Sequence, residues 1–328
     1  MPGLVVRKDN GNLRWYPFFT QETKHTFYPS KDRGQNDTGF KVGRGFKFEK
    51  YLPGYWMEGG DKSVRRRIGG GNSLVVLEKD GDLKFYRFEG ETFLVGNTGK
   101  RVGKGFKPEW DYYVAEWTGN GTSDLLVRDE KGELRLFPWD GEEFKDLGRD
   151  EDVGVGFDKE KYPDLLPGYW TNGEFPDLVV REENGSMWLY PFNGKDFRKS
   201  GDRDRIGRGF GEEFTHYLVG EWMQNGTPDL IVRRENGQLT RYVFNKIGNE
   251  YKFEDKPYET VGKGFHDDWT YLVGHWRQPG KPDLVLRDDD NNMRFYPFDE
   301  GEFTDLPGGD KKVGKGWKFS HLWDFYPV

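Results

Sequence analysis

The stretch Asp229–Phe244, DLIVRRENGQLTRYVF, decides the fold because the chain repeats it. Close copies stand at Asp124–Trp139, Asp177–Phe192 and Asp283–Phe298, and degenerate copies begin at Leu4 and Leu74. A β-branched run leads into Glu-Asn-Gly, a hairpin signal because Asn-Gly tolerates the positive φ of tight turns. An alternating run follows, so the stretch predicts two antiparallel strands joined by a turn, six times over.

A second repeated phrase, [VI]-G-x-G-[FW], has its first glycines at 43, 103, 154, 207, 262 and 314, in steps of 51 to 60 residues. A short aromatic run ending in tryptophan follows each phrase, at Trp56, Trp117, Trp170, Trp222, Trp276 and Trp323. Helical periodicity is absent. Four strands per unit and six units predict an all-β fold, a six-bladed β-propeller of four-stranded antiparallel blades.

The chain ends carry complementary parts of one unit. In four units the tryptophan precedes the next strand's leucine by 8 residues, as from Trp222 to Leu230. Five residues follow Trp323 and Leu4 is the fourth residue, so joining the ends gives 5 + 4 = 9. We therefore predict one domain over residues 1–328, closed by a composite blade from both termini, which leaves no exposed sheet edge.

Composition limits the functional classes. Only 34% of the 328 residues are hydrophobic while 17% are aromatic, so the core must be rich in Phe, Tyr and Trp, and the six repeated tryptophans are expected there. The absence of cysteine excludes disulfides and thiolate metal sites. The net charge of −7 argues against a general nucleic-acid binder.

No apolar run is long enough to insert into a membrane. The start of the chain lacks a signal-peptide pattern, so the protein is either cytoplasmic or secreted after removal of a leader, and the compartment stays open. The oligomeric state stays open too, and a monomer is compatible with the sequence.

The units resemble the FG-GAP or VCBS-type repeats of integrin-like propellers. In that family the loop after the tryptophan, D-x-N-x-D-G-x-x-D, holds calcium. Here the matching stretches include Glu116–Asp124 (EWTGNGTSD) and Glu221–Asp229 (EWMQNGTPD), which keep the last Asp but not the interior carboxylates. Calcium needs six to eight oxygen ligands, so we expect no metal site and no cofactor.

A second resemblance is to tachylectin-like sugar-binding propellers, which carry a similar Gly-rich phrase. Val313–Trp323 (VGKGWKFSHLW) is the closest match. This resemblance implies glycans or glycoconjugates as partners.

An arginine recurs at the end of the β-branched strand, and the loop with the Gly-rich phrase returns to that end. We therefore expect Lys104, Trp110 and Arg128 on one face, and Glu116, Trp117 and Asp124 on the opposite face. Clefts between blades on the arginine face would stack sugars on aromatic side chains and bind hydroxyls with cations. The candidate carbohydrate-binding residues are Arg7, Lys104, Trp110, Arg128, Arg181, Phe210, Arg233, Lys263, Phe265, Trp269, Arg287 and Trp317. In the alternative interpretation each arginine is a structural anchor that bridges to carboxylates or caps carbonyls.

The leading hypothesis is a multivalent lectin, since six weak sites on one rigid ring gain avidity. The first alternative is a protein-interaction scaffold, which could use the Arg65–Arg67 loop, an insertion of ten residues. The second is an enzyme acting on glycans at a single site in the central channel. No catalytic motif or catalytic residue stands out, so the sequence predicts a binding protein rather than an enzyme.

Overall fold

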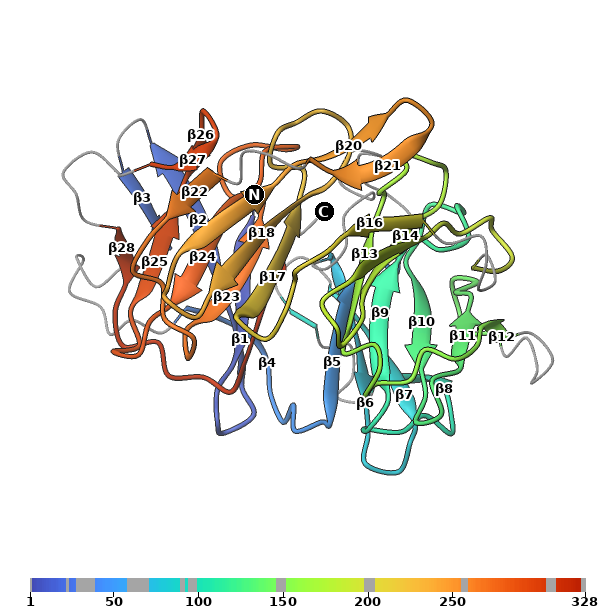
Figure 1. The fold of residues 1–328 in the computed structure, drawn as a ribbon. Helices are drawn as coiled ribbons and strands as arrows, with labels where there is room; N and C mark the ends of the chain where they lie inside the picture. Colours follow the sequence, from blue (N-terminus) through green and yellow to red (C-terminus); the bar gives the residue numbers. More distant parts are fainter. Residues whose placement is uncertain are drawn as a thin grey trace.

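The computed structural model describes residues 2–21, 24–27, 39–57, 71–88, 92–93, 99–145, 152–197, 204–254, 259–304 and 311–325. Every regular element in these ranges is a β-strand, and the strands form six four-stranded antiparallel blades in a ring (Figure 1). The predicted six-bladed β-propeller is therefore confirmed. None of the described residues belongs to a helix that could span a membrane.

Each blade contains four strands, here called A to D from the inside of the ring outward. Blade 1 contains β5 (Lys50–Gly54), β6 (Ser73–Leu77), β7 (Leu83–Arg87) and β8 (Lys100–Gly103). Blade 2 contains β9 (Asp111–Ala115), β10 (Asp124–Arg128), β11 (Leu134–Phe137) and β12 (Asp152–Gly154). Blade 3 contains β13 (Asp164–Gly168), β14 (Asp177–Arg181), β15 (Met187–Tyr190) and β16 (Asp204–Gly207).

Blade 4 contains β17 (Phe214–Gly220), β18 (Asp229–Arg234), β19 (Leu239–Tyr242) and β22 (Glu259–Gly262). Blade 5 contains β23 (Thr270–Gly274), β24 (Asp283–Arg287), β25 (Met293–Tyr296) and β28 (Lys312–Gly314). Blade 6 contains β29 (His321–Phe325), β1 (Gly3–Arg7), β2 (Leu13–Gln21) and β4 (Phe40–Gly43). Because β29 pairs with β1 from Gly3↔Phe325 to Arg7↔His321, blade 6 combines strands from both ends of the chain.

Aromatic pairs join each blade to the next. The aromatic residue that closes each Gly-rich phrase packs against an aromatic residue of strand C in the following blade. The six ring centroids lie 4.3 to 5.0 Å apart, in the pairs Phe46–Tyr86, Phe106–Phe137, Phe157–Tyr190, Phe210–Tyr242, Phe265–Tyr296 and Trp317–Tyr16. The high aromatic content therefore lies mainly between blades, where large flat side chains fill wedge-shaped gaps.

The six repeated tryptophans lie in the core as predicted, with at most 5% of each residue exposed. The indole Nε1 of Trp56, Trp117, Trp170 and Trp222 donates a hydrogen bond to the carbonyl four residues earlier, at 2.9 to 3.1 Å. Each ring also packs against the next blade, as Trp170 does against Phe244 at 5.2 Å. These contacts satisfy the indole N–H while burying the ring.

Short hairpins between strands C and D were not predicted. They are β2 with β3 (Lys24–Phe27), β20 (Phe244–Ile247) with β21 (Glu250–Phe253), and β26 (Phe298–Asp299) with β27 (Glu302–Phe303). In the sequence they appear only as polar stretches, because their few aromatic residues do not alternate over a long enough run. Each hairpin lies against strand D of the preceding blade, as β21 does against β16. The Arg65–Arg67 loop lies outside the described residues.

Candidate binding sites between the blades

The repeated strand-B arginines hold the loops that connect successive blades. Four of them donate to a main-chain carbonyl in the loop leading from their own blade to the next, namely Arg7 to Phe46 (2.9 Å), Arg128 to Tyr162 (2.6 Å), Arg233 to Phe265 (2.9 Å) and Arg287 to Phe319 (3.1 Å). Arg181 pairs with Asp164 and lies 5.6 Å over the ring of Tyr217 in the next blade. These contacts match the structural interpretation of the arginines.

The arginine of blade 2 illustrates how fully these groups are engaged. Arg128 is 3% exposed, and its Nε and Nη2 lie 2.8 and 2.6 Å from one carboxylate oxygen of Asp111. The other carboxylate oxygen of Asp111 accepts from Lys159 at 3.0 Å. The guanidinium therefore has protein partners for most of its donors.

The aromatic candidates are mostly covered by protein. Phe210, Phe265 and Trp317 are 2–3% exposed, and Trp110 is 8% exposed. Trp269 is half-buried and stacks on His266 at 4.7 Å. Lys104 and Lys263 are exposed. The structure thus brings Trp110 beside the Asp111–Arg128 pair, but most of the aromatic faces expected to stack on sugars face neighbouring blades. The carbohydrate-binding role of all twelve residues stays a prediction.

The loops that resemble calcium sites are closed by protein hydrogen bonds on the opposite face. Asp124 Oδ1 accepts from the amide of Trp139 at 2.9 Å, and Oδ2 accepts from the amide and hydroxyl of Thr118 at 2.8 Å. Glu116 Oε1 accepts from the amide of Gly121 at 2.8 Å. Burial raises the pKa of the Asp124 carboxyl to about 6, although these hydrogen bonds oppose the rise. Both carboxylates that the calcium motif retains are therefore already used by the loop itself.

One cluster of carboxylates appears in the blade 1 hairpin, where oxygens of Glu78, Asp80 and Asp82 lie within 4.8 Å of one another. Glu78 pairs with Lys84 at 2.8 Å, and Asp80 accepts from the amide of Asp82 at 3.2 Å. An exposed hairpin with these partners is ordinary turn chemistry.

The mouth of the central channel holds a cavity of 460 Å³ lined by strands β5, β9 and β13 together with Arg128. Burial raises the pKa of Tyr112 and of Tyr113 in this wall, so both phenols stay protonated at neutral pH. The enzyme alternative would need a general base here, and the carboxylate of Asp111 is already paired with Arg128.

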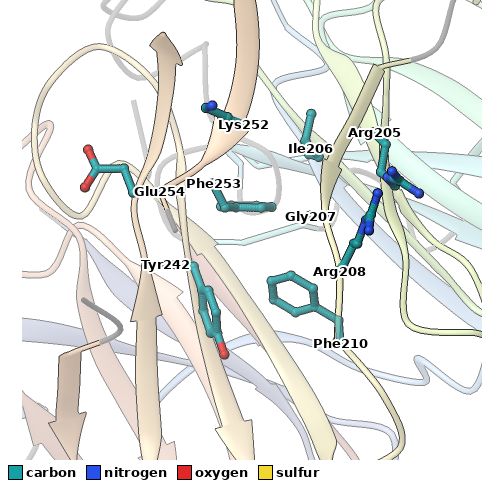
Figure 2. Close-up of a pocket in the computed structure, with 9 residues that line it drawn as sticks. All are labelled: Arg205, Ile206, Gly207, Arg208, Phe210, Tyr242, Lys252, Phe253 and Glu254. Atoms are coloured by element: carbon teal, nitrogen blue, oxygen red, sulfur yellow. The ribbon is translucent and has the colours of Figure 1, made fainter. Parts of the chain in front are cut away.

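A basic cleft opens between blades 3 and 4, with a volume of 280 Å³ (Figure 2). Arg205 and Arg208 line it from the β16 side, and Lys252 and Glu254 line it from the β21 side. Its floor is apolar, made by the buried side chains of Ile206, Phe210, Tyr242 and Phe253. The side chains of the cleft carry three positive charges and one negative charge, in a protein whose net charge is −7.

A second cleft, here called the notch, lies between blades 1 and 2 on the face of the A–B loops and has a volume of 480 Å³. Its walls are Trp56, Met57, Phe85 and Trp139, and its rim carries Arg87, Asn120, Thr122 and Asp140. Trp139 Nε1 donates to the carbonyl of Trp56 at 2.7 Å, which ties the two blades together beneath the notch.

Equivalent positions at three other blade interfaces are filled by the chain itself. Between blades 2 and 3, Phe175 covers the hairpin turn, because a Cβ on Gly194 would meet its ring at 2.8 Å. Between blades 3 and 4, Tyr251 stacks on Phe244 and donates to the carbonyl of Thr171 at 3.3 Å. Between blades 4 and 5, a Cβ added to Gly301 would lie 2.8 Å from the guanidinium of Arg241, so this side chain covers the turn there.

In the notch turn a Cβ on Gly141 would meet no atom within 4 Å. The same holds for Gly248 in the β20–β21 turn, but there Tyr251 occupies the interface. Thr122 stands at the loop position that Phe175 occupies in blade 3, and no described side chain takes the place of the Phe175 ring in the notch.

Apart from Phe210, a candidate site residue, and Trp56, expected in the core, the residues of both clefts were not singled out by the sequence analysis, which searched for what the repeats share. The signal lay in their differences. Trp139 stands where the other five repeats have Phe. Arg205 precedes one Gly-rich phrase and Arg208 lies within it, and the next hairpin carries Lys252.

No protein-family model matches the chain, and no curated protein matches it. Among solved structures it is similar to a mutant of AofleA from Arthrobotrys oligospora in which three arginines are replaced by alanine, with 10% identity and a TM-score of 0.45 over 97% of this chain and 84% of that one. It is also similar to BBS1N in complex with ARL6DN, with 12% identity and a TM-score of 0.38 over 91% and 73% of the two chains.

A third similar structure is the WD40 domain of SCAP from fission yeast, with 11% identity and a TM-score of 0.38 over 70% of this chain and 51% of that one, so the match spans about half of that chain. Because no family model matches the chain, its resemblance to the FG-GAP, VCBS and tachylectin-like subtypes is not confirmed. The chain is a β-propeller, and its function is argued from its own clefts.

Proposed function

We propose that this propeller is a protein-interaction scaffold whose partner inserts an aromatic side chain into the notch between blades 1 and 2. The observation that carries the proposal is the comparison of equivalent interfaces. Phe175 and Tyr251 fill the positions between blades 2 and 3 and between blades 3 and 4, while no side chain of the described residues fills the notch beside Thr122. A partner's Phe, Tyr or Trp completes the packing that the chain completes elsewhere with its own residues.

The chemistry of the notch suits such a side chain. Met57 and Phe85, which are half-buried, form the accessible apolar wall, and the buried rings of Trp56 and Trp139 support it, with the centroids of Phe85 and Trp139 5.4 Å apart. An inserted aromatic side chain removes roughly 150–250 Å² from water, an upper limit of about 4–6 kcal/mol. Aromatic anchors in well-packed pockets dominate many protein interfaces. Polar side chains at the rim, among them Asp140, would bind the partner's peptide backbone on either side of the inserted aromatic residue.

The lectin hypothesis remains the alternative function. It asks for exposed aromatic platforms beside cations with unused donors. The strand-B arginines have protein partners, and Phe210, Phe265 and Trp317 are buried, which favours the scaffold over a ring of sugar sites.

The direct test fills the notch with the side chain that blade 3 uses. Peptides selected from a random displayed library against the wild-type protein should share a Phe, Tyr or Trp, and calorimetry should measure their affinity. Thr122→Phe should weaken binding roughly 30-fold or more, the equivalent of about 2 kcal/mol. The matched control, Phe175→Thr, makes the reverse exchange in the next blade and should leave this affinity unchanged.

Met57→Ala trims the wall without disturbing the A–B loop of blade 2 and should weaken binding by a smaller factor. Peptides without an aromatic residue, or equal affinity for wild type and Thr122→Phe, would refute the proposal. A glycan array run on the same proteins separates the two functions. A neutral sugar that binds wild type and is lost in Thr122→Phe would assign the notch to a lectin and also overturn the scaffold.

A further inference from the structure

We propose that the basic cleft between blades 3 and 4 binds a phosphate or sulfate monoester. The cleft lies at a different blade interface from the notch, and its ligand chemistry does not rest on the scaffold function. Arg205, Arg208 and Lys252 line one cleft of 280 Å³ (Figure 2).

Among the described residues, Arg205 lacks the carboxylate partner that its counterpart in blade 1, Arg101, has. In blade 1, Arg101 lies 3.5 Å from Asp82 and Lys100 lies 3.3 Å from Glu142. In blades 2 and 4, the strand-C arginines Arg135 and Arg241 pair with the strand-D carboxylates Asp152 and Glu259. Within the part of the chain that the structure describes, no carboxylate forms an ion pair with Arg205, Arg208 or Lys252. In blade 3 the strand-C position is Trp188, and the guanidinium of Arg205 lies 5.8 Å over its ring.

The remaining carboxylate of the cleft is already engaged. Glu254 accepts a hydrogen bond from the side-chain amide of Asn245 on the neighbouring strand β20. The described side chains that line the cleft therefore carry a net charge of +2, which a dianion neutralises.

The kinds of donor in the cleft, together with its buried apolar side chains, favour an oxyanion as the ligand. Two guanidinium groups offer planar pairs of N–H donors that match phosphate and sulfate oxygens, and Lys252 adds a point charge. Ile206, Phe210 and Phe253 lie beneath them and are at most 4% exposed. A low-dielectric floor strengthens the attraction between the cations and a bound anion. The volume admits the anionic group with a small part of the molecule that carries it.

The test uses the full chain and four probes in isothermal titration calorimetry at low ionic strength: inorganic phosphate, inorganic sulfate, a phosphoserine peptide and a sulfated disaccharide. The unphosphorylated peptide and the unsulfated disaccharide serve as reference ligands. At least one anionic probe should bind, with an affinity that falls as salt rises. Comparison of the affinities of the phosphoserine peptide and the sulfated disaccharide shows whether a peptide or a sugar carries the anionic group.

The charge-reversed variant Arg205→Glu/Arg208→Glu should lose about 10-fold or more of that affinity, since both donors of paired hydrogen bonds are removed. The matched control is Arg101→Glu/Lys104→Glu, which reverses the same two repeat positions in blade 1. It should bind the probe as wild type does, and unchanged unfolding curves show that both variants fold. If no anionic probe binds, if the reference ligands bind equally well, or if the two variants lose affinity to the same extent, the proposal is overturned.

Discussion

Replacing Arg128 tests whether the repeated arginines are structural anchors or ligand groups. Arg128→Met keeps the aliphatic length of the side chain but removes every donor. It leaves the carbonyl of Tyr162, a residue 4% exposed, without the guanidinium that now donates to it at 2.6 Å. It also leaves Asp111 with one cation, Lys159 at 3.0 Å.

The expected cost follows from these contacts. A buried carbonyl that loses its donor costs about 1–3 kcal/mol, and a hydrogen bond to a charged group contributes about 1.5–3 kcal/mol. The Asp111 side chain is 32% exposed, so water and Lys159 offset part of the second loss. We therefore expect Arg128→Met to lower the free energy of unfolding by about 3 kcal/mol.

Equilibrium unfolding in urea measures this change, with Arg208→Met as the control. Arg208 is exposed and has no ion pair among the described residues, so its replacement should change the free energy of unfolding by less than about 0.5 kcal/mol. If Arg128→Met unfolds within about 1 kcal/mol of wild type while binding to a glycan array is lost, the anchor interpretation is wrong and the arginine acts on ligand.

Two further predictions concern the carboxylates and the aromatic pairs. Burial raises the pKa of Asp124 and of Asp229 to about 6 from 3.8, so the folded protein retains protons that the unfolded chain releases. The contribution of each of these carboxyls to the free energy of unfolding should therefore fall as pH rises from about 4 to about 6, by up to about 3 kcal/mol. Urea midpoints at several pH values check this, and a slope that Asp124→Asn/Asp229→Asn does not flatten would contradict it. Phe157→Leu and Tyr190→Leu remove the two rings of one aromatic pair, whose centroids lie 5.0 Å apart. A double-mutant cycle should give a coupling of about 0.5–1.5 kcal/mol, and strictly additive losses would show that the pair contributes only buried area.

The repeats let the sequence predict the architecture before any coordinates. Strands A to D, their order, and the tryptophans at the end of strand A all follow from spacing, because every unit solves the same packing problem with the same residues. The β-branched run at Leu230–Val232 predicted a strand, and the structure shows that its residues are fully buried. Turn chemistry is equally local, as at Gly237 with φ of 78°.

The function of the repeated residues was not readable in the same way. An arginine that recurs beside an aromatic residue suits a sugar site as well as a structural anchor, since both need a cation near the surface. The carbonyl that Arg128 caps lies 34 residues away in the chain, and only folding brings it to 2.6 Å. The spacing of residues in the sequence shows what the units share, but it does not show which guanidinium donors already bind other parts of the protein.

The two clefts depend on what distinguishes one blade from another. Thr122 in place of Phe175 is a single exchange in a polar loop, and only folding places it in one cleft with Trp56 and Phe85 of the preceding blade. Arg205 and Lys252 are 47 residues apart, yet they line one cleft because β21 lies against β16. The sequence by itself therefore determined the ring and the packing within each unit, because those depend on local periodicity. The tertiary structure alone decided where neighbouring units leave space and uncompensated charge, because both arise from side chains that different blades contribute.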